Sequence, residues 1–279
     1  MKVSIVGYGF VGKALLNAFT DQVDVQKIDP ILNTSTDEIK DFIPDIIFIC
    51  VPTPMNQNGT QDISVLIDVI ETIRSFNLSS LVVVKSTILP SYVSQIENML
   101  EKFVYNPEFL REKHANEDFI NSKMIIFGGN KSSAEELSNF YNDFLNCKCK
   151  DFIITDPTSA SFIKYMINSF LATKVIFFNE FNNLFKSSNA KEDWSRLTEI
   201  IAMDERLGSS HMDVPGHDGR YGFGGACLPK DSKAIIKYAD EMKVNLKILK
   251  TVINVNNKIR SSYNDNMPRE DEQNIIFED

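Results

Sequence analysis

Cys227 lies in a segment whose residue types suit a nucleophile, Gly222-Phe223-Gly224-Gly225-Ala226-Cys227-Leu228-Pro229-Lys230-Asp231. The paired glycines let the backbone approach a ligand, and Pro229 favours a helix that starts just after the thiol. The helix dipole and Lys230 then favour the thiolate, which lowers the thiol pKa below its ordinary value of about 8.5. Asp231 lies four residues after the cysteine, one helical turn from the sulfur, and is placed to position a water.

A glycine pattern, Gly7-Tyr8-Gly9-Phe10-Val11-Gly12, follows an expected strand and opens an expected helix. Gly7 permits a tight turn, Gly9 lets the backbone approach a pyrophosphate, and Gly12 allows close helix–strand packing. Asp29 ends the next expected strand, where a carboxylate binds the ribose hydroxyls and repels a 2′-phosphate. We therefore predict NAD as the cofactor, in preference to NADP. With an activated cysteine, this site predicts oxidation of a carbon held covalently on sulfur.

The composition is that of a globular protein with one or two domains, since 43% of the 279 residues are hydrophobic and 24% are charged. The net charge of -9 argues against nucleic acid or an acidic membrane as a partner. No apolar run reaches the roughly 18 residues of a membrane span, and the N-terminus does not resemble a signal peptide. We expect a cytoplasmic protein.

The other cysteines and the histidines are expected to be structural. Cys50 lies in an apolar strand, and Cys147 and Cys149 lie at a helix-to-strand junction. The four cysteines lack both metal spacing and a disulfide framework, which favours a reducing compartment. The three histidines lack helical ligand spacing, so we predict no metal site.

The first half of the chain alternates short apolar strands with amphipathic helices, which predicts an α/β domain with a Rossmann-type parallel sheet. The expected strands cover residues 2–6, 23–28, 46–51, 81–85, 103–105, 123–127 and 152–155. The expected helices cover residues 11–20, a short stretch from 36, 63–76, 90–100 and 133–146.

After Pro157 the pattern changes to a long helix over 159–186 that contains neither Gly nor Pro. Its apolar positions go most of the way round the helix, so we expect it to be buried on several sides. Further helices are expected over 194–203, 229–241 and 246–262. We therefore predict an NAD-binding Rossmann domain over 1–158, an all-helical domain with the cysteine over 159–262, and a flexible tail over 263–279.

Seven segments occur in the order in which one known family has them. They are the glycine pattern, Cys50-Val51-Pro52-Thr53-Pro54, Lys85-Ser86-Thr87, Asn106-Pro107-Glu108-Phe109-Leu110-Arg111-Glu112, residues 163–174 (IKYMINSFLATK), Phe178-Asn179-Glu180 and the Cys227 segment. Over about residues 1–260 the chain resembles the UDP-glucose/GDP-mannose dehydrogenase family. The resemblance implies an NAD-dependent, four-electron oxidation of a nucleotide sugar at C6, from UDP-glucose to UDP-glucuronate.

The resemblance also implies roles for individual residues. The residues that it implies bind the cofactor are Gly7, Gly9, Phe10, Val11, Gly12, Asp29, Val51, Pro52, Thr53, Pro54, Ser86, Thr87 and Glu112. The residues that it implies bind the substrate are Glu108, Phe109, Leu110, Arg111, Glu112, Lys164, Asn168, Arg206, Tyr221, Phe223 and Gly224. The implied catalytic residues are Cys227, Lys164, Asn168, Asp231, Glu108 and Thr87.

In the implied reaction a first hydride leaves C6 with the help of a base, either Lys164 or a water held by Thr87 and Asp231. Cys227 then adds to the aldehyde, and the thiohemiacetal passes a second hydride to another NAD. The thioester is hydrolysed by a water that Glu108 or Asp231 activates. Lys164 and Asn168 stabilise negative charge on the substrate oxygen.

Two other functions stay open. β-Hydroxyacid and 6-phosphogluconate dehydrogenases share the spacing of Lys164 and Asn168, but they transfer one hydride and need no cysteine. An NAD-binding protein without full catalysis is the other alternative.

The family implies a homodimer through the long helix, with a nucleotide sugar as substrate. Typical members continue into a second Rossmann-like domain that holds the nucleotide, and we expect this chain to be a short form without it.

Overall fold

Residues 1–278 are described by a computed structural model and divide into two units. The first unit consists of Met1–Thr53 and Asp62–Lys164, and the second consists of Pro54–Gln61 and the chain from Tyr165 onward. The sequence predicts a boundary after residue 158, whereas the division lies at Lys164, inside a helix. Among the described residues, none of the helices is both long and apolar enough to cross a bilayer.

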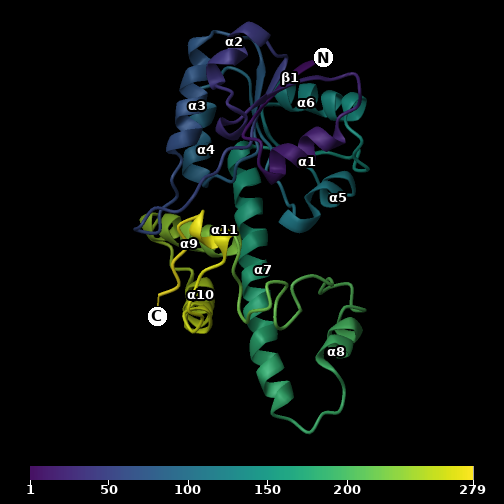
Figure 1. The fold of residues 1–279 in the computed structure, drawn as a ribbon, viewed down its shortest axis with the longest axis vertical. Helices are drawn as coiled ribbons and strands as arrows, with labels where there is room; N and C mark the ends of the chain where they lie inside the picture. Colours follow the sequence, from purple (N-terminus) through teal and green to yellow (C-terminus); the bar gives the residue numbers. More distant parts are fainter. Residues whose placement is uncertain (279) are drawn as a thin grey trace. The chain divides into compact units, whose positions relative to one another are not determined.

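The first unit is built on a seven-stranded sheet with the strand order β2-β1-β3-β4-β5-β6-β7 (Figure 1). The strands are β1 (Lys2–Val6), β2 (Asp24–Ile28), β3 (Ile46–Ile49), β4 (Leu81–Val84), β5 (Phe103–Tyr105), β6 (Ile126–Gly129) and β7 (Ile153–Thr155). Strand β1 lies between β2 and β3, so the strand order reverses at β1: β2 is added on one side of it, and β3 and the later strands are added on the other. Such a switch point is where open α/β sheets bind ligands. The predicted Rossmann-type sheet is confirmed.

Helices cover both faces of this sheet (Figure 1). They are α1 (Phe10–Ala18), α2 (Ile39–Phe42), α3 (Ser64–Ser75), α4 (Pro90–Glu97), α5 (Ala115–Ile120) and α6 (Lys131–Phe144), with 3₁₀ turns at Pro30–Leu32, Thr36–Glu38 and Glu112–His114. Successive strand residues point to opposite faces. Ile46 and Phe48 of β3 therefore pack with α1, α5 and α6, whereas Ile47 and Ile49 pack with α3 and α4. Burial on both faces explains why these strands are wholly apolar.

Two features of the first unit differ from the prediction. Strand β6 runs antiparallel to β5, whereas the other neighbouring strands are parallel. An apolar strand looks the same in either direction, so the alternating pattern carries no information about strand direction. Helix α5 is also absent from the prediction, since this short helix buries only Ala115 and Phe119.

The second unit is helical and is built on the long helix α7 (Pro157–Lys186), whose first residues belong to the first unit. The other helices are α8 (Trp194–Ile201), α9 (Leu228–Glu241), α10 (Lys247–Arg260) and α11 (Pro268–Asp271). Ala172 and Ile176 of α7 pack with Phe223 and with Val252 and Ile253 of α10. The expected helical domain on one long helix is confirmed.

One face of α7 is exposed, contrary to the prediction that this helix is buried on several sides. Ala172, Ile176 and Phe178 are buried, but six other large apolar side chains of this helix are 40% to 67% exposed. These side chains are Phe162, Met166, Phe170, Phe177, Phe181 and Leu184. The helix is therefore apolar on more sides than the rest of the chain covers, and the prediction of burial on several sides is wrong.

The segment after α10, which the sequence predicts to be a flexible tail, packs on the second unit in the structure. It contains α11, and the exposed fractions of Glu270 and Ile275 are 0% and 1%. The backbone N–H of Met55 donates to Gln273 O at 3.2 Å, and Asn274 Nδ2 donates to Met55 O at 3.1 Å. The segment therefore also contacts the Pro54–Gln61 stretch of its own unit.

Replacement of Ile47 by alanine tests the two-sided burial of β3. Ile47 is fully buried, and we expect Ile47→Ala to lower the free energy of unfolding by about 2–5 kcal/mol because a cavity is left. Urea unfolding followed by circular dichroism measures the change. Ile31→Ala is the matched control, since Ile31 is 90% exposed and its loss should cost less than about 0.5 kcal/mol. Equal losses in the two variants would contradict the described core.

Candidate active site

The glycine turn after β1 has the geometry of a dinucleotide-binding turn. Gly7 has φ of +91°, and its N–H donates to Ile28 O at 2.8 Å. A Cβ at Gly7 would lie 2.7 Å from the carbonyl carbon of Cys50, so only glycine fits. Gly9 is the N-cap residue of α1, and a Cβ at this position would meet no atom within 4 Å. The start of α1 is therefore open to a phosphate group.

Asp29 lies beside this turn, directly after β2. Its Oδ2 accepts the backbone N–H of Tyr8 at 2.7 Å, and its Oδ1 accepts the N–H of Ile31 at 2.9 Å. Each carboxylate oxygen can accept a further hydrogen bond. The carboxylate thus both holds the glycine turn and retains acceptor capacity for ribose hydroxyls.

The turns that follow β3 and β4 are tied to each other. Ser86 Oγ donates to Val51 O at 2.7 Å, and Thr53 Oγ1 donates to Thr87 O at 2.8 Å. Both turns follow the carboxyl ends of parallel strands, at the edge where the glycine turn also lies. The structure therefore places the glycine turn, the Val51–Thr53 turn and the Ser86–Thr87 turn at the same edge of the sheet. Phe10 and Val11 stand in the first turn of α1.

Lys85 forms a buried polar cluster that sequence reasoning missed. Its Nζ donates to Asn106 Oδ1 at 2.8 Å, and Tyr141 OH donates to the same oxygen at 2.7 Å. Burial lowers the pKa of Lys85 to about 8, although nearby Cys50 and Glu108 oppose this change. Burial raises the pKa of the Cys50 thiol to about 12. The sequence does contain a sign of this cluster, since Lys85 directly follows the wholly apolar strand Leu81–Val84.

Glu108 and Lys164 form a buried ion pair in the first unit. Their exposed fractions are 8% and 3%. Lys164 Nζ lies 3.2 Å from Glu108 Oε1 and donates to Glu108 O at 2.5 Å, and Glu108 Oε2 accepts the N–H of Leu110 at 2.6 Å. The ammonium also lies 5.2 Å from the centroid of the Phe109 ring. The pair holds a basic and an acidic group in direct contact, an arrangement that permits proton transfer.

Arg111, at the end of the same predicted substrate segment, pairs with a carboxylate of α5. The Arg111 guanidinium donates two hydrogen bonds to the Asp118 carboxylate, at 2.7 and 3.0 Å, and these bonds raise the pKa of Arg111. Glu112 begins a 3₁₀ turn after Arg111. The arginine thus fixes the end of the predicted substrate loop to α5.

Cys227 is the N-cap residue of α9, so the predicted helix start after the thiol is observed. Asp231 is 1% exposed, and its N–H donates to Cys227 O at 3.0 Å. Asn168 Nδ2 donates to Asp231 Oδ2 at 2.6 Å, and Lys230 Nζ lies 2.6 Å from Asp231 Oδ1. The structure therefore brings Asn168 of α7 to Asp231. The Lys230 charge contacts this carboxylate.

The loop before Cys227 is held by side chains. The N–H groups of Tyr221, Gly222, Phe223 and Gly225 donate to the side-chain oxygens of Tyr263, Asn179, Asn256 and Glu270, respectively. Sequence reasoning assigned no role to these four acceptors. Arg206, a predicted substrate residue, pairs with Asp204 and has a side chain that is 87% exposed.

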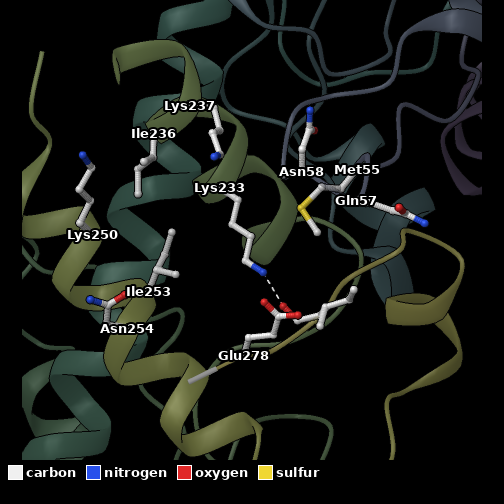
Figure 2. A pocket seen from close by; sticks show the side chains of 12 residues that line it. Met55, Gln57, Asn58, Lys233, Ile236, Lys237, Lys250, Ile253, Asn254 and Glu278 are labelled. Carbon is white, nitrogen blue, oxygen red and sulfur yellow. Dashed lines mark hydrogen bonds between the residues drawn. The ribbon is translucent and has the colours of Figure 1, made fainter. Parts of the chain in front are cut away.

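A cavity of about 400 Å³ lies elsewhere in the second unit, between the Met55–Gly59 stretch, α9, α10 and the C-terminal segment (Figure 2). Three lysines line it, Lys233, Lys237 and Lys250. Lys233 points across it and donates to Ile276 O (Figure 2). Within the described chain, none of the predicted catalytic residues lines this cavity.

The fold and the glycine turn define a Rossmann-type dinucleotide-binding protein, and its second unit carries a cysteine at a helix start. The chain belongs to the UDP-glucose/GDP-mannose dehydrogenase family. The NAD binding domain of that family matches residues 26–145, and its central domain matches residues 158–258. NAD is therefore the cofactor of the first unit.

Two bacterial relatives agree with this family. The chain is 35% identical over 240 residues to UDP-glucose 6-dehydrogenase of Rickettsia prowazekii (strain Madrid E), which covers 82% of this chain and 52% of the relative. It is 28% identical over 306 aligned residues to UDP-glucose 6-dehydrogenase TuaD of Bacillus subtilis (strain 168), covering 93% of this chain and 63% of the relative. The chain thus spans about half the length of the rickettsial relatives.

Among solved structures, a UDP-glucose dehydrogenase from the hyperthermophilic archaeon Pyrobaculum islandicum superposes with a TM-score of 0.74 at 26% identity. The match covers 92% of this chain and 68% of that chain. The two units described above therefore have the fold of known sugar-nucleotide dehydrogenases.

The buried Lys85 should make stability depend on pH. Between its pKa of about 8 in the folded chain and its ordinary value of 10.5, the unfolded chain holds a proton that the folded chain has released. The unfolding free energy of the parent should therefore rise with pH through this window, by about 3 kcal/mol from Lys85 alone. Lys85→Met should lack this contribution.

Urea unfolding at pH 7.5, 9 and 10.5 measures the difference between the two proteins. Both proteins carry Cys50→Ser, because the Lys85 charge lowers the pKa of that thiol and its titration would otherwise differ between them. Tyr141, whose pKa burial raises, titrates in both proteins and drops out of the comparison. If the stabilities of the parent and of Lys85→Met stayed parallel over this range, the depressed pKa of Lys85 would be refuted.

Proposed function

We propose that this chain carries out the NAD-dependent, four-electron oxidation of a nucleotide-sugar C6 alcohol to the carboxylate, with UDP-glucose as substrate and UDP-glucuronate as product. The observation that carries the proposal is the position of Cys227 as the N-cap residue of α9, one helical turn before the buried Asp231. Oxidation of an aldehyde to an acid by hydride transfer is helped by a covalent carrier, and a thiol at a helix start suits this task.

The covalent steps take place on the sulfur of Cys227. NAD supplies the hydride acceptor in each of the two oxidations. The thiolate adds to the C6 aldehyde and forms a C–S bond, and loss of a hydride from the same carbon leaves a thioester. Water then adds to the thioester carbonyl, the C–S bond breaks, and the carboxylate and the thiol are released. Each acid formed therefore corresponds to two NADH, and the reactive aldehyde stays bound.

Asp231 is proposed to position the attacking water. Lys230 and Asn168 each contact one of its carboxylate oxygens, which fixes the orientation of the group. Each oxygen has a second lone pair for a water hydrogen. The Asn168 amide has two N–H groups, and only one is needed for Asp231. The other is proposed to donate to the negative oxygen of the substrate.

Lys164 is proposed as the base of the first oxidation, and its contact with Glu108 supports this choice over a water held by Thr87 and Asp231. The ammonium lies 3.2 Å from Glu108 Oε1 in a buried setting. The ammonium first passes a proton to this carboxylate, and the neutral amine that results takes the proton of the C6 hydroxyl as the hydride leaves the same carbon for NAD. Phe109 to Glu112, Arg206, and the Tyr221–Gly224 backbone are proposed to contact the nucleotide sugar.

A homodimer through α7 is part of the proposal. The exposed apolar side chains of α7, named above, form a stripe of a kind that proteins normally cover. A second copy of the same helix presents the same side chains, and such self-complementary contact is usual in twofold dimers. The 87% exposed side chain of Arg206 is available to the partner copy's substrate.

The ratio of NADH to product tests the proposed function. With NAD and UDP-glucose, we expect two NADH per UDP-glucuronate, measured by absorbance and chromatography. Cys227→Ser should still bind NAD but lose net turnover by at least roughly 1,000-fold, because removal of a catalytic nucleophile is costly. Cys149→Ser is the matched control and should keep the parent rate. One NADH per sugar, or full activity of Cys227→Ser, would contradict a reaction through a Cys227 thioester.

The cofactor preference tests Asp29. We expect Asp29→Asn to raise the dissociation constant for NAD by roughly 10-fold or more, since a charged hydrogen bond to the ribose is lost. The preference for NAD over NADP should narrow at the same time, because the repulsion of the 2′-phosphate disappears. Isothermal titration with both cofactors measures these constants. Asp24→Asn, at the exposed start of β2, serves as the control, and equal behaviour of the two variants would exclude the assigned role.

A further inference from the structure

The C-terminal segment contributes a buried carboxylate to the loop that precedes Cys227. Glu270 Oε1 accepts the N–H of Gly225 at 3.0 Å and a hydrogen bond from Arg260 at 2.5 Å. The side chains of Arg260 and Glu270 are 1% and 0% exposed. Gly225 stands two residues before Cys227. A charged group outside the matched central domain thus reaches the backbone next to the proposed nucleophile.

Close packing at Gly224 shows how tightly this contact is built. A Cβ at Gly224 would overlap both the Arg260 guanidinium and the Glu270 carboxylate. Glycine is therefore required at position 224 because the ion pair lies directly against the backbone, in addition to any approach of a ligand. The ion pair and the loop fit each other as one packed feature.

Arg260 links the ion pair to the other end of the loop. Its NH1 donates to Asp218 Oδ2 at 2.8 Å and to Tyr221 O at 3.4 Å. Burial opposes ionisation of Asp218, but hydrogen bonds from Arg260 and from the Arg220 N–H outweigh it, so the pKa of Asp218 lies below its ordinary value. The buried guanidinium is thus held between two carboxylates, and removal of either leaves its charge poorly compensated.

Glu270 itself is fixed by the segment that carries it. Its Oε2 accepts the N–H of Met267 at 2.8 Å. Beyond α11, Asn257 Nδ2 donates to Glu278 O at 2.7 Å, and Lys233 donates to Ile276 O across the cavity of Figure 2. The part of the segment that follows Glu270 is therefore anchored to α9 and α10. These anchors allow Glu270 to hold the loop rigidly.

We propose that Glu270 is a positioning residue for Cys227, which acts through Gly225 N–H and Arg260. The inference rests on the proposed function, because it gives the loop and the thiol a shared catalytic role. Three neutral side chains, Tyr263, Asn179 and Asn256, hold the loop from Tyr221 to Phe223. Glu270 holds the position nearest the cysteine, so its loss frees the end of the loop that sets the sulfur.

Two readouts on the full chain test this proposal. Glu270→Ala should lower kcat by about 10- to 100-fold with the KM for NAD within twofold, because small misplacement of a reacting group is costly. Alkylation of Cys227 by iodoacetamide, followed by peptide mass spectrometry, should become at least about threefold faster as the loop opens. Glu270→Gln keeps an acceptor for Gly225 N–H and should recover part of both effects.

Glu272→Gln is the matched control. Glu272 lies in the same segment, is exposed and pairs with Arg269, so this variant should match the parent in both readouts. A folded Glu270→Ala with an alkylation rate at Cys227 that is unchanged or lower overturns the proposal. This readout needs no sugar nucleotide, so absence of turnover in the parent would sink the proposed function and still leave the role of Glu270 decidable.

Should Glu270→Ala fail to fold, the double variant Arg260→Met with Glu270→Leu replaces it. Apolar replacement of both partners removes this buried ion pair, which proteins often tolerate, and Asp218, the other partner of Arg260, keeps its hydrogen bond from the Arg220 N–H. The Gly225 N–H still loses its acceptor in this variant. Faster alkylation of Cys227 would then support the positioning role, and the parent rate would overturn it.

Discussion

Backbone hydrogen bonding between parallel strands fixes the edge of the sheet on which the cofactor site depends. The ladder continues beyond the strands themselves: the N–H groups of Cys50, Lys85 and Asn106 donate to Val6, Ile49 and Val84 at 2.7, 2.8 and 2.8 Å. The residues that end each strand are thereby set in register. This register fixes where the glycine turn, the Val51–Thr53 turn and the Ser86–Thr87 turn lie. Side-chain hydrogen bonds between the turns then stabilise positions that the backbone has already set.

Buried charges recur in both units, and each has a partner that satisfies it. Lys85 is held by Asn106, and Lys164 by Glu108, in the first unit. In the second unit, Asp231 lies between Asn168 and Lys230, and Arg260 lies between Asp218 and Glu270. A buried charge without such a partner would be strongly destabilising. The polar groups therefore cost less stability than their burial suggests, and their orientations are restricted to the few that the partners allow.

Two cysteines of the chain lie in contrasting surroundings. Cys50 follows an apolar strand of the sheet, and burial raises the pKa of its thiol to about 12, so it remains a neutral thiol. Cys227 instead occupies the start of α9, where backbone N–H groups point toward the N-cap. The two thiols therefore have different surroundings because of where the fold places them, and the residue type alone does not predict this difference.

Local patterns in the sequence determined the strands, most helices, the glycine turn with Asp29, and the cysteine at a helix start, because each depends on neighbours within a few positions. Motif resemblance supplied the other site residues. The tertiary structure alone decided the antiparallel β6, the exposed face of α7, the Lys85–Asn106 cluster and the burial of Glu270. Each of these depends on contacts between distant parts of the chain, and Glu270 in a polar segment carries no local sign that Arg260 and Gly225 N–H will receive it.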